Sequence, residues 1–182
     1  ELVAAGLKAS RESGDVVTVR TDVLDLKIGL QWGELRHADL LSYPFVKGEK
    51  APVRLFTREG REGFFVLQTG LAGGAANSAH PNHLAPFAAS ERNYELASGE
   101  TELRVPLTWT DGNGVTVTKT FVFRRGQYRI DLEYAVENAS SAPWQAACGS
   151  SGASTPSLRG RKMRTVVPFP GSLLSWISPP DC

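Results

Sequence analysis

The feature that most constrains the fold of this sequence is an alternation of apolar and polar residues on both sides of a glycine-rich turn. Apolar residues occupy every second position before the turn: Leu103, Val105, Leu107 and Trp109. After it, the apolar positions are Val115, Val117, Phe121 and Phe123. The turn, residues 111–114, holds two glycines, which tolerate the positive φ angles of tight turns. The pattern predicts an antiparallel hairpin with one buried and one solvated face.

A third strand follows this hairpin with the same period. Tyr128, Ile130, Leu132, Tyr134 and Val136 share one face, which we expect to be buried. Arg129, Asp131, Glu133 and Glu137 share the other face, which we expect to be solvated. Pro106 cannot donate to a ladder of hydrogen bonds, so its strand is expected at a sheet edge or a bulge.

Short strands are also expected elsewhere in the chain. Residues 16–30 show strand periodicity with a change of phase, which predicts one strand with a bulge near Asp22. Residues 53–56 and 64–67 are further candidates, and residues 70–90, rich in glycine and proline, are expected to form a long surface loop. Short strands with frequent turns predict an all-β, antiparallel β-sandwich.

Composition removes several functional classes. The 182 residues are 41% hydrophobic and 21% charged, which is typical of a globular domain. The formal net charge of +1 gives no whole-chain argument for binding nucleic acid or an anionic membrane. Two cysteines, Cys148 and Cys182, are too few for a disulfide framework, and their spacing is not that of a metal site.

The histidines and acidic residues lack the neighbouring residues in the sequence that a metal site or a catalytic site would need. His80 and His83 lie three apart in a loop without a nearby acidic or thiol ligand, and His37 has no neighbouring nucleophile. The pair Asp131 and Glu133 resembles a solvated strand face rather than a pair of glycosidase carboxylates. We therefore expect no catalytic residue, no cofactor and no metal site.

Aromatic side chains are the remaining candidates for contact with a ligand or partner. Trp109 is in phase with the apolar face and is expected in the core. Trp32 and Tyr43 are outside such a pattern, so they are the predicted contact residues.

Several segments of the sequence resemble segments of the periplasmic domain of YidC, and they follow one another in the same order. YidC is the Gram-negative member of the YidC/Oxa/Alb family of membrane protein insertases. The similar segments are residues 19–28, 40–44, 94–96, 103–110, 119–123, 125–128 and 134–138. The resemblance implies an extended β-sandwich similar to galactose mutarotase. It also implies a position on the periplasmic face of the inner membrane, between the first two transmembrane helices of the parent protein.

The function implied by this resemblance is scaffolding or partner contact, without catalysis, in a protein that assists insertion and folding of inner-membrane proteins. The implied partners are the Sec translocon and SecDF, through the parent protein. Substrate membrane proteins would be bound by transmembrane helices that this sequence lacks. No nucleic-acid partner is implied, and the oligomeric state is left open. The first alternative is a carbohydrate- or peptide-binding β-sandwich, and the second is a mutarotase-like enzyme.

The sequence is predicted to have three parts. Residues 1–16 are expected to form a flexible leader, and residues 17–144 the first part of the YidC-type sandwich. Residues 145–182 form an atypical tail without alternation, in which Asp181 is the only acidic residue. We hypothesise that a shifted reading frame produced this tail, in which case its cysteines and the basic residues 159–164 carry no evolved function.

Overall fold

The structure is a computed structural model that describes residues 16–56, 66–73, 79–141, 144, 146–148 and 163–167. These residues form strands, turns and extended segments, without a helix. Nowhere in these ranges is there a helix that could cross a bilayer. The prediction of an all-β, mainly antiparallel sandwich is therefore confirmed for the described part of the chain. The predicted leader, residues 1–15 of it, lies outside the described residues.

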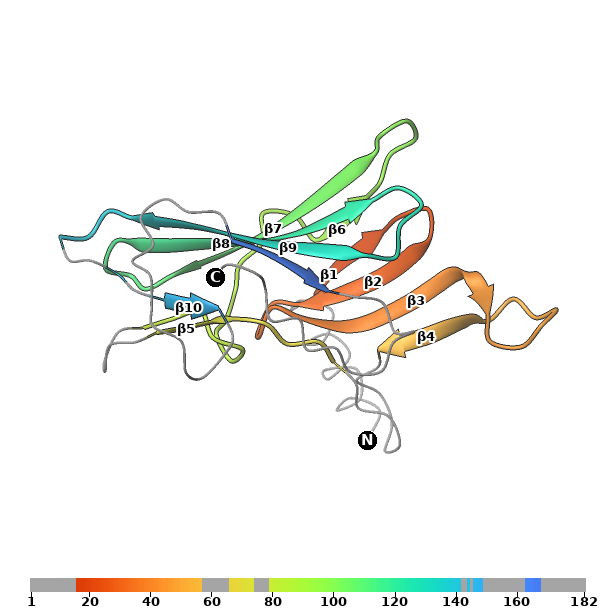
Figure 1. The fold of residues 1–182 in the computed structure, drawn as a ribbon, viewed down its shortest axis with the longest axis horizontal. Coiled ribbons are helices and arrows are strands. Elements are labelled where there is room, and N and C mark those ends of the chain that lie inside the picture. The colour runs from red at the N-terminus through yellow and green to blue at the C-terminus, as the bar shows by residue number, and fades with distance from the viewer. Residues whose placement is uncertain are drawn as a thin grey trace, which may run out of the picture.

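The first sheet is built from the N-terminal strands (Figure 1). Its order is β4-β3-β2-β1-β6, and only the β1–β6 pair is parallel. The strands are β1 (Val16–Arg20), β2 (Leu24–Gly29), β3 (Glu34–Pro44), β4 (Pro52–Phe56) and β6 (Asn93–Glu95). The predicted strand at residues 53–56 is thus confirmed as β4.

The second sheet contains the meander predicted from the alternating pattern. Its order is β11-β9-β8-β7, and all of its pairs are antiparallel. The strands are β7 (Glu102–Thr110), β8 (Val115–Arg124), β9 (Ile130–Asn138) and β11 (Met163–Val167). A separate small sheet pairs β5 (Leu71–Gly73) with β10 (Ala146–Cys148).

The predicted β7–β8 hairpin has the expected turn chemistry. The Asp111 carboxylate accepts hydrogen bonds from the Asn113 and Val115 amides, at 2.7 and 2.9 Å. Gly112 and Gly114 have φ angles of 75° and 104°, which favour glycine. Pro106 lies in β7, the last strand in the order of its sheet, so the expectation of an edge strand is confirmed.

The prediction of one strand over residues 16–30 is wrong, because the chain reverses there. Val19 pairs with Leu26 across an antiparallel β1–β2 hairpin. The Thr21 hydroxyl accepts hydrogen bonds from the amides of Val23 and Leu24, at 3.2 and 3.0 Å, and so stabilises the turn. The change of phase near Asp22 therefore marks a turn. The register shifts in this sheet lie instead between β2 and β3 and between β3 and β4.

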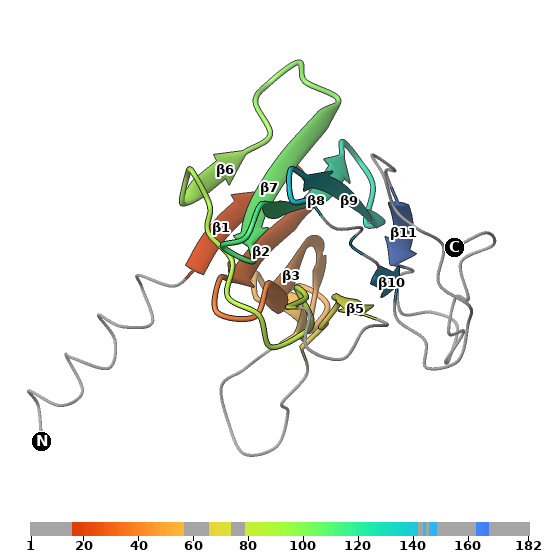
Figure 2. The same cartoon turned by 90° about the vertical axis from the view of Figure 1, so that its left-hand side faces the viewer.

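Figure 2 shows the two main sheets from the side. They share one hydrophobic core, to which the first sheet contributes Val17, Leu26 and Ile28, and the second contributes Leu107 and Phe121. These side chains are all 3% exposed or less. The predicted core position of Trp109 is confirmed, with 8% of the residue exposed.

The prediction of a surface loop over residues 70–90 is wrong in part. Leu71 and Phe87 are buried in the same core. The Phe87 amide donates to the Leu30 carbonyl at 2.7 Å, which places this segment against the β2–β3 turn. Within the candidate strand at 64–67, Leu67 bridges to Leu35, whereas residues 64–65 lie outside the described ranges.

Candidate functional site

The two predicted contact residues are at opposite ends of β3. Trp32 lies in the turn before β3 and is partly exposed, whereas Tyr43 is close to the last residue of this strand. Since a strand rises about 3.3 Å per residue, roughly 30 Å separate them. One small ligand therefore cannot contact both. Tyr43 is 52% exposed, and its ring lies 5.4 Å from the ring of Tyr128.

The three histidines are not brought together as a site. His37 lies on β3, beside Asp39. His80 stacks on Trp144 with a ring separation of 4.9 Å, and His83 is exposed. Within the described ranges, no three His, Cys, Asp or Glu side chains are grouped as metal ligands would be.

Asp39 on β3 forms a compact ion-pair group with its neighbours. Arg54 on β4 donates through Nε and a terminal nitrogen to the two carboxylate oxygens, at 2.8 and 2.9 Å. His37 Nε2 lies 3.1 Å from Oδ2. The hydrogen bonds from Arg54 hold the pKa of Asp39 below its usual value, although burial opposes them. This carboxylate therefore holds no proton near neutral pH, and its contacts join β3 to β4.

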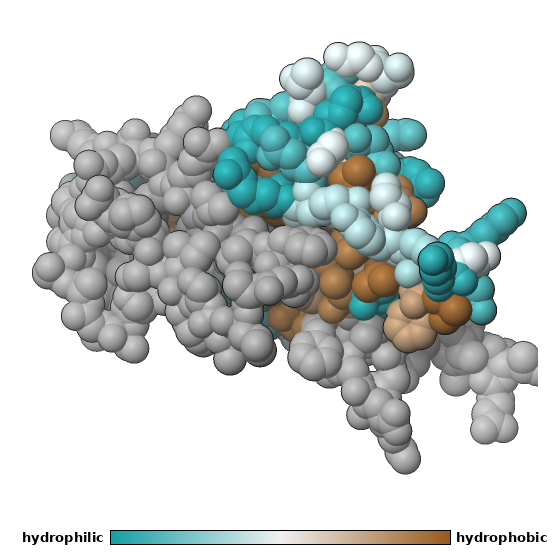
Figure 3. All heavy atoms as spheres, turned by 45° about the vertical axis from the view of Figure 1, so that its right-hand side comes forward, coloured by the Kyte–Doolittle hydropathy of each residue, from teal (hydrophilic) through white to brown (hydrophobic). Residues whose placement is uncertain are grey.

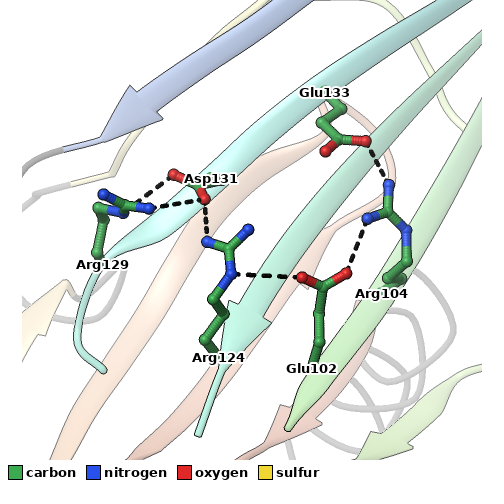
Figure 4. Close-up of polar contacts among 6 residues, drawn as sticks. All are labelled: Glu102, Arg104, Arg124, Arg129, Asp131 and Glu133. Atoms are coloured by element: carbon green, nitrogen blue, oxygen red, sulfur yellow. Dashed lines mark hydrogen bonds and ion pairs between the residues drawn. The ribbon is translucent and has the colours of Figure 1, made fainter. Parts of the chain in front are cut away.

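A larger charged network covers the outer face of the second sheet (Figure 4). Its arginines and carboxylates come from β7, β8, β9 and the segment just before β9: Glu102, Arg104, Arg124, Arg129, Asp131 and Glu133. Arg124 contacts Asp131 on β9 and Glu102 on β7, the latter at 3.3 Å. The hydrogen bond to Asp131 raises the pKa of Arg124, so this guanidinium stays charged.

Asp131 corrects one expectation about this face. The alternating pattern predicted a solvated position, yet Asp131 is 0% exposed. Arg124 and Arg129 both contact its carboxylate, and β11 pairs alongside it. A carboxylate can be buried at such a place because its charge is neutralised by arginine.

The sequence prediction missed a buried polar cluster between the sheets, centred on Lys119. This residue is 0% exposed and stands on the core face of β8. Its Nζ donates to the carbonyls of Gly33 and Thr69, at 2.6 and 3.0 Å. The rings of Phe87 and Phe121 each have their centroid 5.3 Å from Nζ. Lys119 thus joins the second sheet to the β2–β3 turn.

Burial changes the proton affinity of this lysine. It lowers the pKa of Lys119 to about 7, against an opposing effect of the Glu34 carboxylate. Glu34 is itself 0% exposed and accepts hydrogen bonds from Arg36 at 2.9 and 3.0 Å. The signal for this cluster was present in the sequence, because Lys119 is in phase with Val117 and Phe121.

These three groups share a structural character. Each joins neighbouring strands or opposed sheets through paired charges or through hydrogen bonds to backbone carbonyls. None of them includes a serine or cysteine nucleophile beside a base in the contacts described above. Each group therefore contributes to cohesion between strands or between sheets.

Comparison with known families identifies the family of this chain. The sequence profile described as the YidC periplasmic domain matches residues 16–172. The chain belongs to the YidC periplasmic domain family. The expected family resemblance is therefore confirmed, and the matched region covers both main sheets.

Curated relatives support the same assignment, and each is named membrane protein insertase YidC. The protein of Methylococcus capsulatus is 46% identical over 136 residues, which are 74% of this chain and 24% of the relative. The protein of Thioalkalivibrio sulfidiphilus is 42% identical over 70% of this chain and 24% of its own length. The protein of Nitrosococcus oceani is 40% identical over 70% and 23%. The chain thus spans about a quarter of the YidC proteins it matches.

Proposed function

We propose that this chain is a non-catalytic scaffold at the periplasmic face of the inner membrane, within a protein that assists insertion and folding of inner-membrane proteins. The observation that carries the proposal is the match of residues 16–172 to the YidC periplasmic domain. Because the chain corresponds to about a quarter of its insertase relatives, the insertion step itself is attributed to the remaining part.

The geometry supports a scaffold because ionisable groups contribute to cohesion of the fold. Lys119 links the sheets, Asp39 links β3 to β4, and Arg124 links three strands of the second sheet. Such contacts resist relative movement of the strands. A stiff domain keeps its surface residues in fixed relative positions, which suits a role in positioning partner proteins.

The proposed partners are the Sec translocon and SecDF, which the domain would contact as part of the parent protein. Substrate membrane proteins would be bound by the transmembrane part of that protein. The available surfaces of the domain are the outer faces of its two sheets, where polar side chains predominate.

Site-specific photocrosslinking in the full-length parent protein tests this contact role. A photoreactive residue would replace one exposed side chain at a time on the two outer faces: Thr18, Lys27, Thr108 or Glu137. At least one position is expected to crosslink to a translocon or SecDF subunit. The buried position Leu107 is the matched control and should give no such product. Absence of crosslinks from both faces would contradict the contact role.

Ligand binding separates this proposal from its first alternative. A carbohydrate- or peptide-binding module would show a saturable change of tryptophan fluorescence, lost on Trp32→Ala. A scaffold without a ligand site would show no saturable change. Polarimetry of anomeric sugar conversion would test the mutarotase-like alternative in the same preparation.

A further inference from the structure

The loop that joins β3 to β4 presents an unusual concentration of exposed apolar side chains. Phe45 is 76% exposed, Tyr43 52% and Val46 45%. In the described part of the chain, Leu84 is the one other large apolar side chain with comparable exposure. We call residues 43–50 the β3–β4 tip. Clustered exposed apolar groups commonly mark a contact with a partner or a membrane.

The β3–β4 tip has an ordered backbone with internal hydrogen bonds. The Phe45 amide donates to the Ala51 carbonyl at 2.8 Å, and the Glu49 amide donates to the Val46 carbonyl at 3.0 Å. Gly48 has a φ angle of 92°, which suits the tight reversal. Because these two amides already have acceptors, they can leave water at little cost.

The charges beside the apolar residues favour contact with an anionic surface. Lys47 and Lys50 are both exposed and flank Glu49, so the turn carries a net positive charge. A lysine can lay its alkyl chain along apolar material and keep its ammonium group at the headgroup level. Each basic residue near an anionic leaflet contributes about 1 kcal/mol of attraction.

The shape of the β3–β4 tip favours shallow insertion. The loop projects from the end of the first sheet, at the right-hand end of Figure 1. The side of the molecule that comes forward in Figure 3 shows apolar side chains beside hydrophilic ones. A projecting loop with outward apolar side chains can insert these side chains into the surface of a bilayer. Tyr43, packed on Tyr128 behind the turn, has the amphipathic ring that is enriched at headgroup level.

We propose that the β3–β4 tip docks on an anionic phospholipid bilayer. Phe45 and Val46 enter the boundary between headgroups and acyl chains, while Lys47 and Lys50 contact headgroup phosphates. The inference rests on the proposed function in one respect, because that function places the domain beside the inner membrane. The contact would hold the first sheet against the bilayer surface.

Vesicle co-sedimentation of the 182-residue chain tests this docking. Vesicles of equal parts phosphatidylethanolamine and phosphatidylglycerol should bind the wild-type chain, and Phe45→Ser/Val46→Ser should weaken binding about tenfold or more. Lys47→Gln/Lys50→Gln should weaken binding to these vesicles while leaving any weak binding to phosphatidylcholine vesicles unchanged. Leu84→Ser is the matched control, since it removes an exposed apolar side chain elsewhere.

A second readout keeps the proposal testable if the double variant does not fold. Tryptophan fluorescence of Phe45→Trp should be quenched by brominated phosphatidylglycerol more strongly than that of Leu84→Trp. Equal quenching, equal vesicle binding by the Phe45 and Leu84 variants, or no binding by the wild-type chain would overturn the proposal. The vesicle assay contains no translocon, so its failure leaves the crosslinking test of the proposed function unaffected.

Discussion

At the scale of single residues, Lys119 is the most informative position in the molecule. It occupies a core position between Val117 and Phe121, yet it carries an ammonium group when protonated. Two backbone carbonyls and two aromatic rings receive this group. These contacts compensate only part of the cost of desolvation, which is why burial lowers the pKa to about 7.

The lowered pKa predicts a dependence of stability on pH. Between pH 7 and the ordinary lysine pKa of 10.5, the unfolded chain binds the proton at Lys119 more strongly than the folded chain. The free energy of unfolding should therefore rise with pH across this interval, by at most about 1.4 kcal/mol per pH unit. Below pH 7 this contribution should level off, since the lysine is charged in both states.

Urea unfolding of the wild-type chain and of Lys119→Met, each measured at several pH values from 7 to 10, checks this prediction. Methionine is an unbranched side chain, one atom shorter than lysine, and it lacks the titrating group, so the difference in slope between the two proteins isolates Lys119. Parallel slopes would show that this lysine keeps an ordinary pKa in the folded state.

At the scale of elements, the outer face of the second sheet contains ion pairs that differ in burial. We expect burial to decide how much each ion pair contributes to stability. Arg124 contacts Asp131, which is 0% exposed, whereas Arg104 contacts Glu102 and Glu133, which are more accessible. Exposed ion pairs contribute about 1 kcal/mol or less, whereas loss of a partner from a buried charge costs several kcal/mol.

Two substitutions in this one network test that ranking. Arg124→Met should lower the free energy of unfolding by about 2–4 kcal/mol, because the buried carboxylate keeps only Arg129 among its arginine partners. Arg104→Met should lower it by about 1 kcal/mol or less. Chemical denaturation at neutral pH measures both, and equal effects would contradict a dominant role for the burial of Asp131.

At the scale of the whole molecule, the two main sheets share one hydrophobic core. Leu26 of β2 and Leu107 of β7 are both 0% exposed and belong to the same cluster. The Lys119 cluster adds polar contacts across the same interface. A shared core of this kind predicts that the sheets unfold together.

Leucine truncation on each sheet tests this cooperativity. Leu26→Ala and Leu107→Ala should each lower the free energy of unfolding by about 2–5 kcal/mol and preserve one transition. Far-ultraviolet circular dichroism reports on all strands, and tryptophan fluorescence reports chiefly on the surroundings of buried rings such as Trp109. Transitions that separate between the two probes in the Leu26→Ala variant would indicate that the first sheet unfolds independently.

The sequence by itself determined the β7–β8–β9 meander, its turn at Asp111 and the core position of Trp109. This was possible because strand alternation and turn chemistry are local properties, legible within about ten residues. The similarity to the YidC periplasmic domain was likewise evident in the sequence, because several similar segments follow one another in the same order. The tail hypothesis and the contact roles of Trp32 and Tyr43 stay predictions.

Only the tertiary structure decided which segments face one another across the core. The reversal at Thr21 looked like a bulge because a local pattern cannot distinguish a bent strand from a tight turn. Phe87 enters the core from a segment with loop composition, because it packs between two sheets formed by parts of the chain that are remote in sequence. Lys119 becomes a buried link only because the carbonyls of Gly33 and Thr69, remote in sequence, are brought to its ammonium group.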